Sequence, residues 1–207
     1  AAYLASQEET GHLETSYVVA SIRNTLDTTD KFYDGEMQFF NRAVAQLMAL
    51  NPDVIISTVL SGPAADISKQ IAARGAFVPT SSLSFVGAQQ YIQAAGESSA
   101  GVSITQVVPN PSSRAPIVAE CAKAMQEAGM TQPMNSTHLE ACIGAKVLTE
   151  AMRRAKKPGD ARSLLAAMQS LGRYDTGGFV VNYAPGQNHG SKFVELAMVS
   201  RDGKLKN

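Results

Sequence analysis

The sequence has no excess of charge of either sign. Its 18 Lys and Arg residues balance its 18 Asp and Glu residues over 207 positions. A chain without net charge does not create the long-range field that recruits nucleic acid or an acidic membrane surface. We therefore expect neither a nucleic-acid partner nor electrostatic attachment to a membrane.

Long hydrophobic runs are also missing. No stretch approaches the roughly 20 consecutive apolar residues that cross a bilayer, so we expect no membrane insertion. The chain does not open with a charged and then apolar signal segment. Its first residues, AAYLASQEETGHLE, have a pattern typical of the middle of a helix. We interpret the chain as a mature or truncated product, whose termini do not settle its compartment.

Enzyme motifs are absent as well. The patterns HExxH, CxxC, GxSxG and GxGxxG, which mark zinc, redox, acyl-transfer and dinucleotide sites, do not occur. His12, His138 and His189 are far apart, and none has a second ligand at helical spacing. The loop GQNHGSK (186–192) lacks the Gly-Lys-Ser/Thr ending of a phosphate loop. The sequence therefore predicts no catalytic residue, metal or cofactor, and a protein that is not an enzyme.

Cysteine is scarce, with only Cys121 and Cys142. Both fall on predicted helices, where a free cysteine behaves as a small buried hydrophobe. The two helices are joined by a short turn, and the cysteines lie about equally far from it. A disulfide is therefore possible if the helices pack antiparallel, and the sequence leaves both alternatives open.

Among the patterns that the sequence does contain is a strand, a turn and a helix in succession. The apolar run DVIISTVL (53–60) predicts a strand covered on both faces. Ser61 is a candidate cap for the next helix, whose inward stripe contains Ile67 and Ile71. Gly75 suits the left-handed position that follows a helix.

The same order recurs around this unit. SYVVASI (16–22) predicts a strand and MQFFNRAVAQLMAL (37–50) a helix. After the first unit, FVPTSSLS (77–84) predicts a strand, FVGAQQYIQAAG (85–96) a helix and GVSITQVVP (101–109) another strand. Strands that alternate with helices are typical of an α/β fold, a parallel sheet flanked by helices.

The alternation stops after this strand. Three helices are predicted in a row, at 114–129, 138–155 and 160–172, with Thr137 and Glu140 as a capping box for the second. The segment 177–204 then resembles two strands around a glycine-rich turn. Such a path predicts two lobes, with the chain crossing between them.

Candidate ligand contacts follow from the expected sheet. In open α/β sheets, ligands bind beyond the carboxyl ends of the strands. The loops there are LSGP (60–63), SLSF (82–85) and VPNP (108–111). Helix starts at Ser61 and near Ser84 would offer free backbone N–H groups to a polar or anionic ligand. Alternatively, both serines are only helix caps.

Five segments in order carry a resemblance to a known family. They are PDVIISTVLSGPAADISKQIAARG, SLSFVGA, AGVSITQVVPNP, LEACIGAKVLTEAMRRA and YDTGGFVVNYAPGQNHGSKFVELAMVSRDGK. From about residue 16 onward, the chain resembles the periplasmic solute-binding proteins of the branched-chain amino acid (Leu/Ile/Val-binding) type. The resemblance implies a periplasmic-binding-protein type I fold, in which two α/β lobes close on a small ligand. It also implies a periplasmic or extracytoplasmic location and an ABC transporter permease as partner.

The resemblance also assigns the lobes. Residues 1–108 would form the α/β sheet of the second lobe, 109–174 the helical part of the first lobe, and 175–207 the strands that return to the second lobe. The sheet of the first lobe has no counterpart in this sequence. The chain therefore resembles the C-terminal portion of such a protein.

The family's pocket positions fall on the strand-end loops. The pocket aromatic falls near Leu60 or Ser61, and the acidic residue that pairs with a ligand amine falls on or beside Ser84, next to Phe85. This sequence has no carboxylate there, so an α-ammonium group would lose a charge-assisted partner. We expect Leu60, Ser61, Ser84 and Phe85 to bind the ligand.

The absence of a carboxylate at this pocket position bears on the class of ligand. The resemblance implies a small polar or carboxylate-bearing ligand, such as an amino acid or an aromatic acid, and the missing carboxylate disfavours a simple aliphatic amino acid. An alternative is a ligand-sensing domain of a receptor or regulator with the same fold. A fused DNA-binding or kinase segment would distinguish that alternative.

Overall fold

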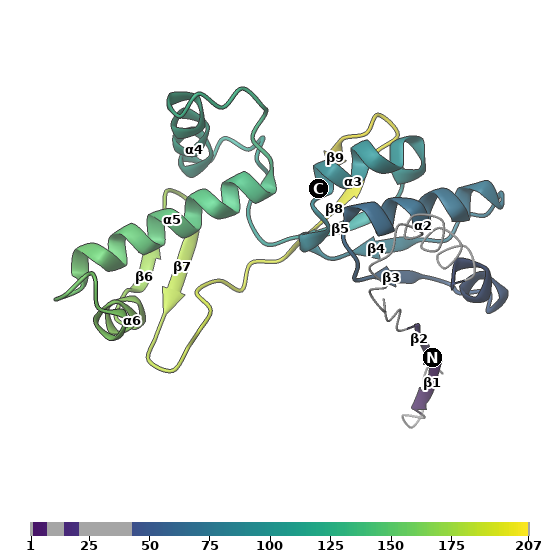
Figure 1. Ribbon diagram of the computed structural model, residues 1–207, viewed down its shortest axis with the longest axis horizontal. Coiled ribbons are helices and arrows are strands. Elements are labelled where there is room, and N and C mark those ends of the chain that lie inside the picture. Colours follow the sequence, from purple (N-terminus) through teal and green to yellow (C-terminus); the bar gives the residue numbers. More distant parts are fainter. Residues whose placement is uncertain (1, 8–14, 21–42, 207) are drawn as a thin grey trace, which may run out of the picture.

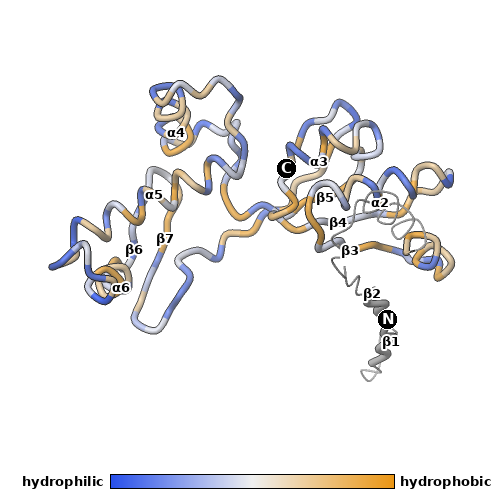
Figure 2. The backbone as a smooth tube through the Cα atoms, viewed as in Figure 1, coloured by the Kyte–Doolittle hydropathy of each residue, from blue (hydrophilic) through white to orange (hydrophobic). Residues whose placement is uncertain are grey.

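The computed structural model describes residues 2–7, 15–20 and 43–206. Most of them form two lobes, which two crossing segments, 107–115 and 184–194, connect (Figure 1). We call residues 43–106 and 195–206 the sheet lobe and residues 116–183 the helical lobe. Figure 2 shows hydrophobic residues at the strand 55–57 and at the start of the strand 180–183, and hydrophilic residues in the turn at 155–160.

The N-terminal residues form a two-stranded antiparallel sheet. Strands β1 (Ala2–Gln7) and β2 (Thr15–Ala20) pair with Ala2 opposite Ala20. The strand expected at 16–22 is therefore confirmed as β2. The helical interpretation of the first residues is wrong for β1, because cross-strand pairing decides the conformation there. The other residues before position 43, including the start of the helix expected at 37–50, lie outside the described residues.

The sheet lobe contains a five-stranded sheet with the order β3-β4-β5-β8-β9. Its strands are β3 (Ile55–Ser57), β4 (Thr80–Ser82), β5 (Ser103–Gln106), β8 (Glu195–Val199) and β9 (Leu205–Lys206). The first three are parallel, as the alternation with helices predicts. Strand β8 is antiparallel to β5, and β9 is antiparallel to β8, so the sheet is mixed.

Helices cover one face of this sheet. They are α2 (Ser61–Ala73), α3 (Ala88–Ala95) and a helical segment at 43–49, with short 3₁₀ turns η1 (Ser84–Val86) and η2 (Gly96–Ser99) on either side of α3. The helix stripes bury Ala64, Ala65, Ile71, Val86 and Tyr91 against Ile55, Ile104 and Val199, and Val44 packs beside α2. The expected stripe of α2 is confirmed, and so is its end, since Gly75 has a φ of +66°.

The other face of the sheet is exposed among the described residues. Along β3, buried Ile55 and Ser57 flank Ile56, whose side chain is 67% exposed. Leu196 and Met198 on β8 are also exposed and alternate with buried residues. The prediction that 53–60 is covered on both faces is therefore wrong here, because the described helices all pack on one side.

The helical lobe contains α4 (Pro116–Glu127), α5 (Ser136–Arg154) and α6 (Ala161–Gln169), close to the three expected spans. The antiparallel pair β6 (Gly172–Asp175) and β7 (Val180–Tyr183) packs against them. Their shared core contains Ile117, Val118, Leu139, Ile143, Val147, Phe179 and Val181. No helix in the described part of the chain is long and apolar enough to cross a membrane.

The path of the C-terminal third differs from the sequence prediction. Strand β6 begins at Gly172, the residue at which the third helix was expected to end, and it pairs with β7. The two strands expected within 177–204 are confirmed as β7 and β8, but they belong to different sheets and do not pair with each other. The chain rejoins the sheet lobe only at β8, later than the expected position 175, because the segment 184–194 first crosses between the lobes (Figure 1).

A tight turn joins β6 to β7. Gly177 and Gly178 have φ values of +115° and +90°, which favour glycine. The backbone N–H groups of both glycines donate to Oδ1 of Asp175, at 2.8 and 2.7 Å. These hydrogen bonds lower the pKa of the Asp175 carboxyl group.

Helix α5 begins at a different cap from the one predicted. The Asn135 side chain accepts from the His138 N–H at 3.0 Å, and Nδ1 of His138 accepts from the Asn135 N–H at 3.3 Å. The capping box of Thr137 and Glu140 is therefore wrong by two residues. Asparagine is a strong N-cap, and His138 takes the place that a glutamate or glutamine usually has at the third helical position.

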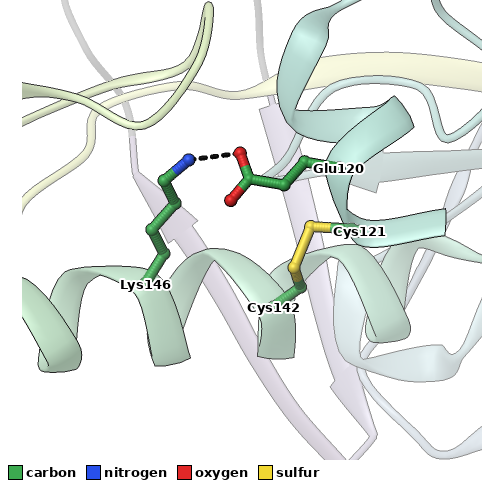
Figure 3. The surroundings of a disulfide bond; sticks show 4 residues. All are labelled: Glu120, Cys121, Cys142 and Lys146. Carbon is green, nitrogen blue, oxygen red and sulfur yellow. Dashed lines mark hydrogen bonds and ion pairs between the residues drawn. A yellow bond between two sulfur atoms is a disulfide. The ribbon is translucent and has the colours of Figure 1, made fainter. Parts of the chain in front are cut away.

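A disulfide between Cys121 and Cys142 joins α4 to α5, with 6.0 Å between their Cα atoms (Figure 3). Of the two alternatives that the sequence leaves open, the structure contains the bridge. Beside it, Nζ of Lys146 on α5 pairs with the Glu120 carboxylate on α4. The two contacts fix the same pair of helices from neighbouring positions.

We expect reduction of the disulfide to destabilise the helical lobe. For a loop closed over 21 positions, loop-closure entropy predicts a loss of about 3 kcal/mol. Urea unfolding with and without dithiothreitol measures this loss. The double variant Cys121→Ala/Cys142→Ala is the control, since its unfolding must not respond to the reductant. An equal midpoint for the oxidised and reduced protein would contradict the expectation.

The charge of Asp175 should make the β6–β7 turn sensitive to acid. Because the folded-state pKa lies below the ordinary value of 3.8, the ionised carboxylate stabilises the fold above that pH. This stabilisation is lost as the pH falls through the folded-state pKa. Asp175→Asn keeps an oxygen acceptor and removes the charge. Its deficit in melting temperature should therefore be largest near neutral pH and shrink in acid; a deficit that stays constant contradicts this cause.

Candidate functional site

The carboxyl ends of β3 and β4 lie side by side. In the parallel register, Ile55 is opposite Thr80 and Ser57 is opposite Ser82. The loop after β3 leads to Leu60, and the loop after β4 leads to Ser84, so both loops start from one edge of the sheet. Strand β5 ends at this edge and continues into the crossing segment 107–115, so the edge lies on the side of the helical lobe (Figure 1).

The first loop presents the beginning of α2. Leu60 is 64% exposed and is the N-cap residue, with an extended backbone and no capping hydrogen bond from its side chain. Ser61 is the first helical residue, so the expected cap by its hydroxyl is wrong. The first turn contains no acidic residue. Among the described residues, therefore, no side chain caps the backbone N–H groups at the start of α2.

The second loop is held by the neighbouring strand. The Ser84 N–H donates to Oγ1 of Thr105 on β5 at 2.9 Å. The expectation of a free backbone donor is therefore wrong for Ser84, whose side chain is partly buried. The next residue, Phe85, is 51% exposed and places an aromatic ring at the surface of this edge.

The third expected loop, VPNP (108–111), has a different role. Val108 is buried in the core of the helical lobe. Asn110 accepts a hydrogen bond from the Ser112 N–H at 2.8 Å, which forms a local turn. This loop therefore leads the chain into the helical lobe, and it does not extend the edge that the other two loops form.

Sequence reasoning missed a polar link between the lobes. Gln106 is buried at the end of β5, and its Oε1 accepts from Oγ of Ser136 at 2.6 Å. Ser136 is the first residue of α5. The contact joins residues 30 positions apart in the sequence, so no local pattern indicates it.

Ser57 is a second residue that sequence reasoning missed. Its side chain is 7% exposed, at the end of β3, and its hydroxyl has no hydrogen-bond partner among the described residues. An unsatisfied buried hydroxyl is uncommon and costs free energy unless a partner reaches it. It lies three positions before Leu60, at the same edge as the two loops.

The edge offers hydroxyl groups, an aromatic ring and helix N–H groups. In the described part of the chain, no group of three or more His, Cys, Asp or Glu residues is placed to hold a metal ion. His138 belongs to the cap of α5, and His189 is exposed in a crossing segment. The arrangement can hold a small molecule by hydrogen bonds and apolar contact.

We expect Thr105 to position the Ser84 loop. Thr105→Val removes the acceptor of the Ser84 N–H, so it should lower the free energy of unfolding by about 1 kcal/mol. Thr105→Ser keeps the oxygen and is the matched control. Urea unfolding gives the energies, and the Ser84 amide resonance reports the loop. An unchanged Ser84 resonance in Thr105→Val would contradict the assignment.

Comparisons with known proteins place this architecture in a family. The periplasmic binding protein family matches residues 12–204. A search of the curated proteins finds no match. Three solved structures are similar over most of the chain, and this chain covers less than half of each of them.

The first is a substrate-binding periplasmic protein from Ralstonia solanacearum, with 30% identity, a TM-score of 0.73, and coverage of 79% of this chain and 48% of that one. An extracellular ligand-binding receptor from Verminephrobacter eiseniae has 26% identity and a TM-score of 0.74, with 83% and 49% covered. A possible leucine/isoleucine/valine-binding protein from Rhodopirellula baltica has 25% identity and a TM-score of 0.71, with 75% and 43% covered. The match over residues 12–204 shows that the chain belongs to the periplasmic binding protein family.

Proposed function

We propose that this chain is the ligand-contacting part of an extracytoplasmic solute-binding protein that delivers its ligand to an ABC permease. The family match over residues 12–204 carries the proposal. The placement of the two strand-end loops at one edge, on the side of the helical lobe, supports it. Transport by the whole protein belongs to the proposal, because the chain spans less than half the length of these relatives.

The ligand is a small polar or carboxylate-bearing molecule. Leu60 and Phe85 are both exposed at the edge and provide apolar and aromatic contact. The hydroxyls of Ser61 and Ser84 provide hydrogen bonds. The start of α2 favours a carboxylate or another electronegative group, because no side chain among the described residues caps its backbone N–H groups.

The missing charge narrows the ligand class further. None of the four proposed contact residues is acidic, so an α-ammonium group has no ionised partner among them. This favours an aromatic acid or an amide-bearing compound over leucine, isoleucine or valine. The Phe85 ring supports the same choice, since aromatic pairs gain contact energy beyond the area that they bury.

The disulfide supports an extracytoplasmic location. Disulfides persist in oxidising compartments such as the periplasm and are rare in the cytosol. The bridge lies between two helices of one lobe, and Cys121 is fully buried. It has the position of a structural bridge.

Lobe closure provides the signal in this proposal. Two crossing segments and the hydrogen bond from Ser136 to Gln106 connect the lobes. A ligand that contacts both lobes binds the closed state more tightly, and its differential affinity shifts the population toward closure.

A panel of amino acids and aromatic carboxylic acids tests the proposed ligand class. We expect a carboxylate-bearing aromatic compound to raise the melting temperature of the chain, because ligands that bind only the folded state stabilise it. Calorimetric titration then gives the affinity. Phe85→Ala should weaken this binding about ten-fold, through loss of a central aromatic contact.

Leu165→Ala is the matched control. Leu165 is also a large exposed hydrophobic residue, but it lies on α6 in the helical lobe. Its replacement should leave the affinity unchanged. Micromolar binding of leucine, isoleucine or valine would refute the ligand class, and a folded chain that binds no member of the panel would refute capture by this chain.

A further inference from the structure

A cavity lies at the opposite edge of the sheet from the proposed ligand loops. Its volume is about 170 Å³, and its wall combines the second half of α2, residues 76–80, η2 and residues 100–102. Thr80 begins β4 and Val102 precedes β5, so the cavity adjoins the amino ends of these strands. It therefore shares no lining residue with the loops at the carboxyl ends.

Two hydroxyl groups of the cavity wall, those of Ser68 and Thr80, act as acceptors. Oγ of Ser68 donates to the Ala64 carbonyl at 3.1 Å and lies 2.7 Å from the Tyr91 hydroxyl. Oγ1 of Thr80 donates to the Val78 carbonyl at 3.0 Å. Because these two hydroxyl hydrogens are already used, the remaining lone pairs favour a ligand that donates hydrogen bonds.

An aromatic ring stands beside the cavity with most of its surface free. Phe77 is 76% exposed. A Cβ atom added at Gly101 would lie 3.2 Å from Cε2 of Phe77, so the ring rests directly on glycine backbone. Gly101 also has a φ of +84°, which disfavours any other residue there. The close approach holds a phenyl ring at the rim of the cavity.

The described part of the cavity wall carries a negative charge. Among the described residues that line the cavity, Glu97 on η2 is the only charged one, and it is exposed. It makes no ion pair with another described residue. An anion would be repelled by this carboxylate, whereas a cation gains from it and from the neighbouring ring.

We propose that this cavity binds a small organic cation, a primary ammonium group on a short apolar body. The ammonium group lies at the rim, near Glu97 and Phe77, and donates to the free lone pairs of the wall. The apolar body packs against Ile71, Val78 and Val102, which line the same cavity. The affinity is millimolar, since the carboxylate is exposed and the contact area is small.

Two probes of equal length test the proposal on the full chain. Butylammonium chloride carries the charge, and n-butanol has a similar apolar body without it. Titrations are followed by the backbone amide resonances, with butylammonium expected to give saturable shifts at Ala72, Ser98 and Gly101. We expect n-butanol to bind at least about three-fold more weakly, and Glu97→Gln to weaken butylammonium about three-fold, as for an exposed ion pair.

Two further variants test the role of the aromatic ring and check that the charge effect is specific to Glu97. Phe77→Leu keeps an apolar side chain and removes the ring, and it should weaken butylammonium about two-fold. Glu140→Gln removes an exposed carboxylate on α5 and should change nothing. Thermal unfolding confirms that each variant is folded.

Equal binding of the two probes, or unchanged binding by Glu97→Gln, would overturn the proposal, and so would shifts that do not saturate. The aromatic-acid panel tests other residues at the other edge of the sheet. The two proposals therefore fail independently.

Discussion

The parallel pairing of β3 with β4 decides where this chain can contact a ligand. The register that places Ser57 opposite Ser82 brings the two following loops to one edge. Each loop then leads into a helix on the same face, and Leu60 before α2 and Phe85 are both exposed. A change of strand order would separate these groups, although every local element could remain intact.

The chain returns to the sheet lobe at β8 after it has formed the helical lobe. Strand β8 pairs antiparallel with β5, and residues 101 and 102 exchange backbone hydrogen bonds with Val199 at 2.8 Å. The chain thus leaves the sheet lobe at the end of β5 and returns beside it. The contact of Gln106 with Ser136 lies where this departure meets α5, and the disulfide joins α5 to α4 within the helical lobe. A connection of only two segments between the lobes favours motion of one lobe as a body.

Local signals predicted most helices and the parallel strands, because hydrophobic periodicity and glycine positions can be recognised within a short stretch of sequence. The stretch that ends at Gly75 is an example. The cap at Asn135 was missed because a second capping pattern lay two residues away. The edge that carries Leu60 and Phe85 could be predicted from topology. The hydrogen bond from the Ser84 N–H to Oγ1 of Thr105 could not be predicted, since it joins residues 21 positions apart. The uncovered side of β3 was also beyond prediction, because an apolar run does not say how many helices pack on it.

The side of the sheet that the described residues leave uncovered has a practical consequence. Ile56, Leu196 and Met198 place apolar side chains on one broad surface, among the small polar residues of β4 and β5. Surfaces of this kind adhere to one another in solution. Salts that are excluded from protein surfaces strengthen such adhesion. Purification of this chain would therefore benefit from dilute, low-sulfate buffers, and hydrophobic-interaction resin should retain it strongly.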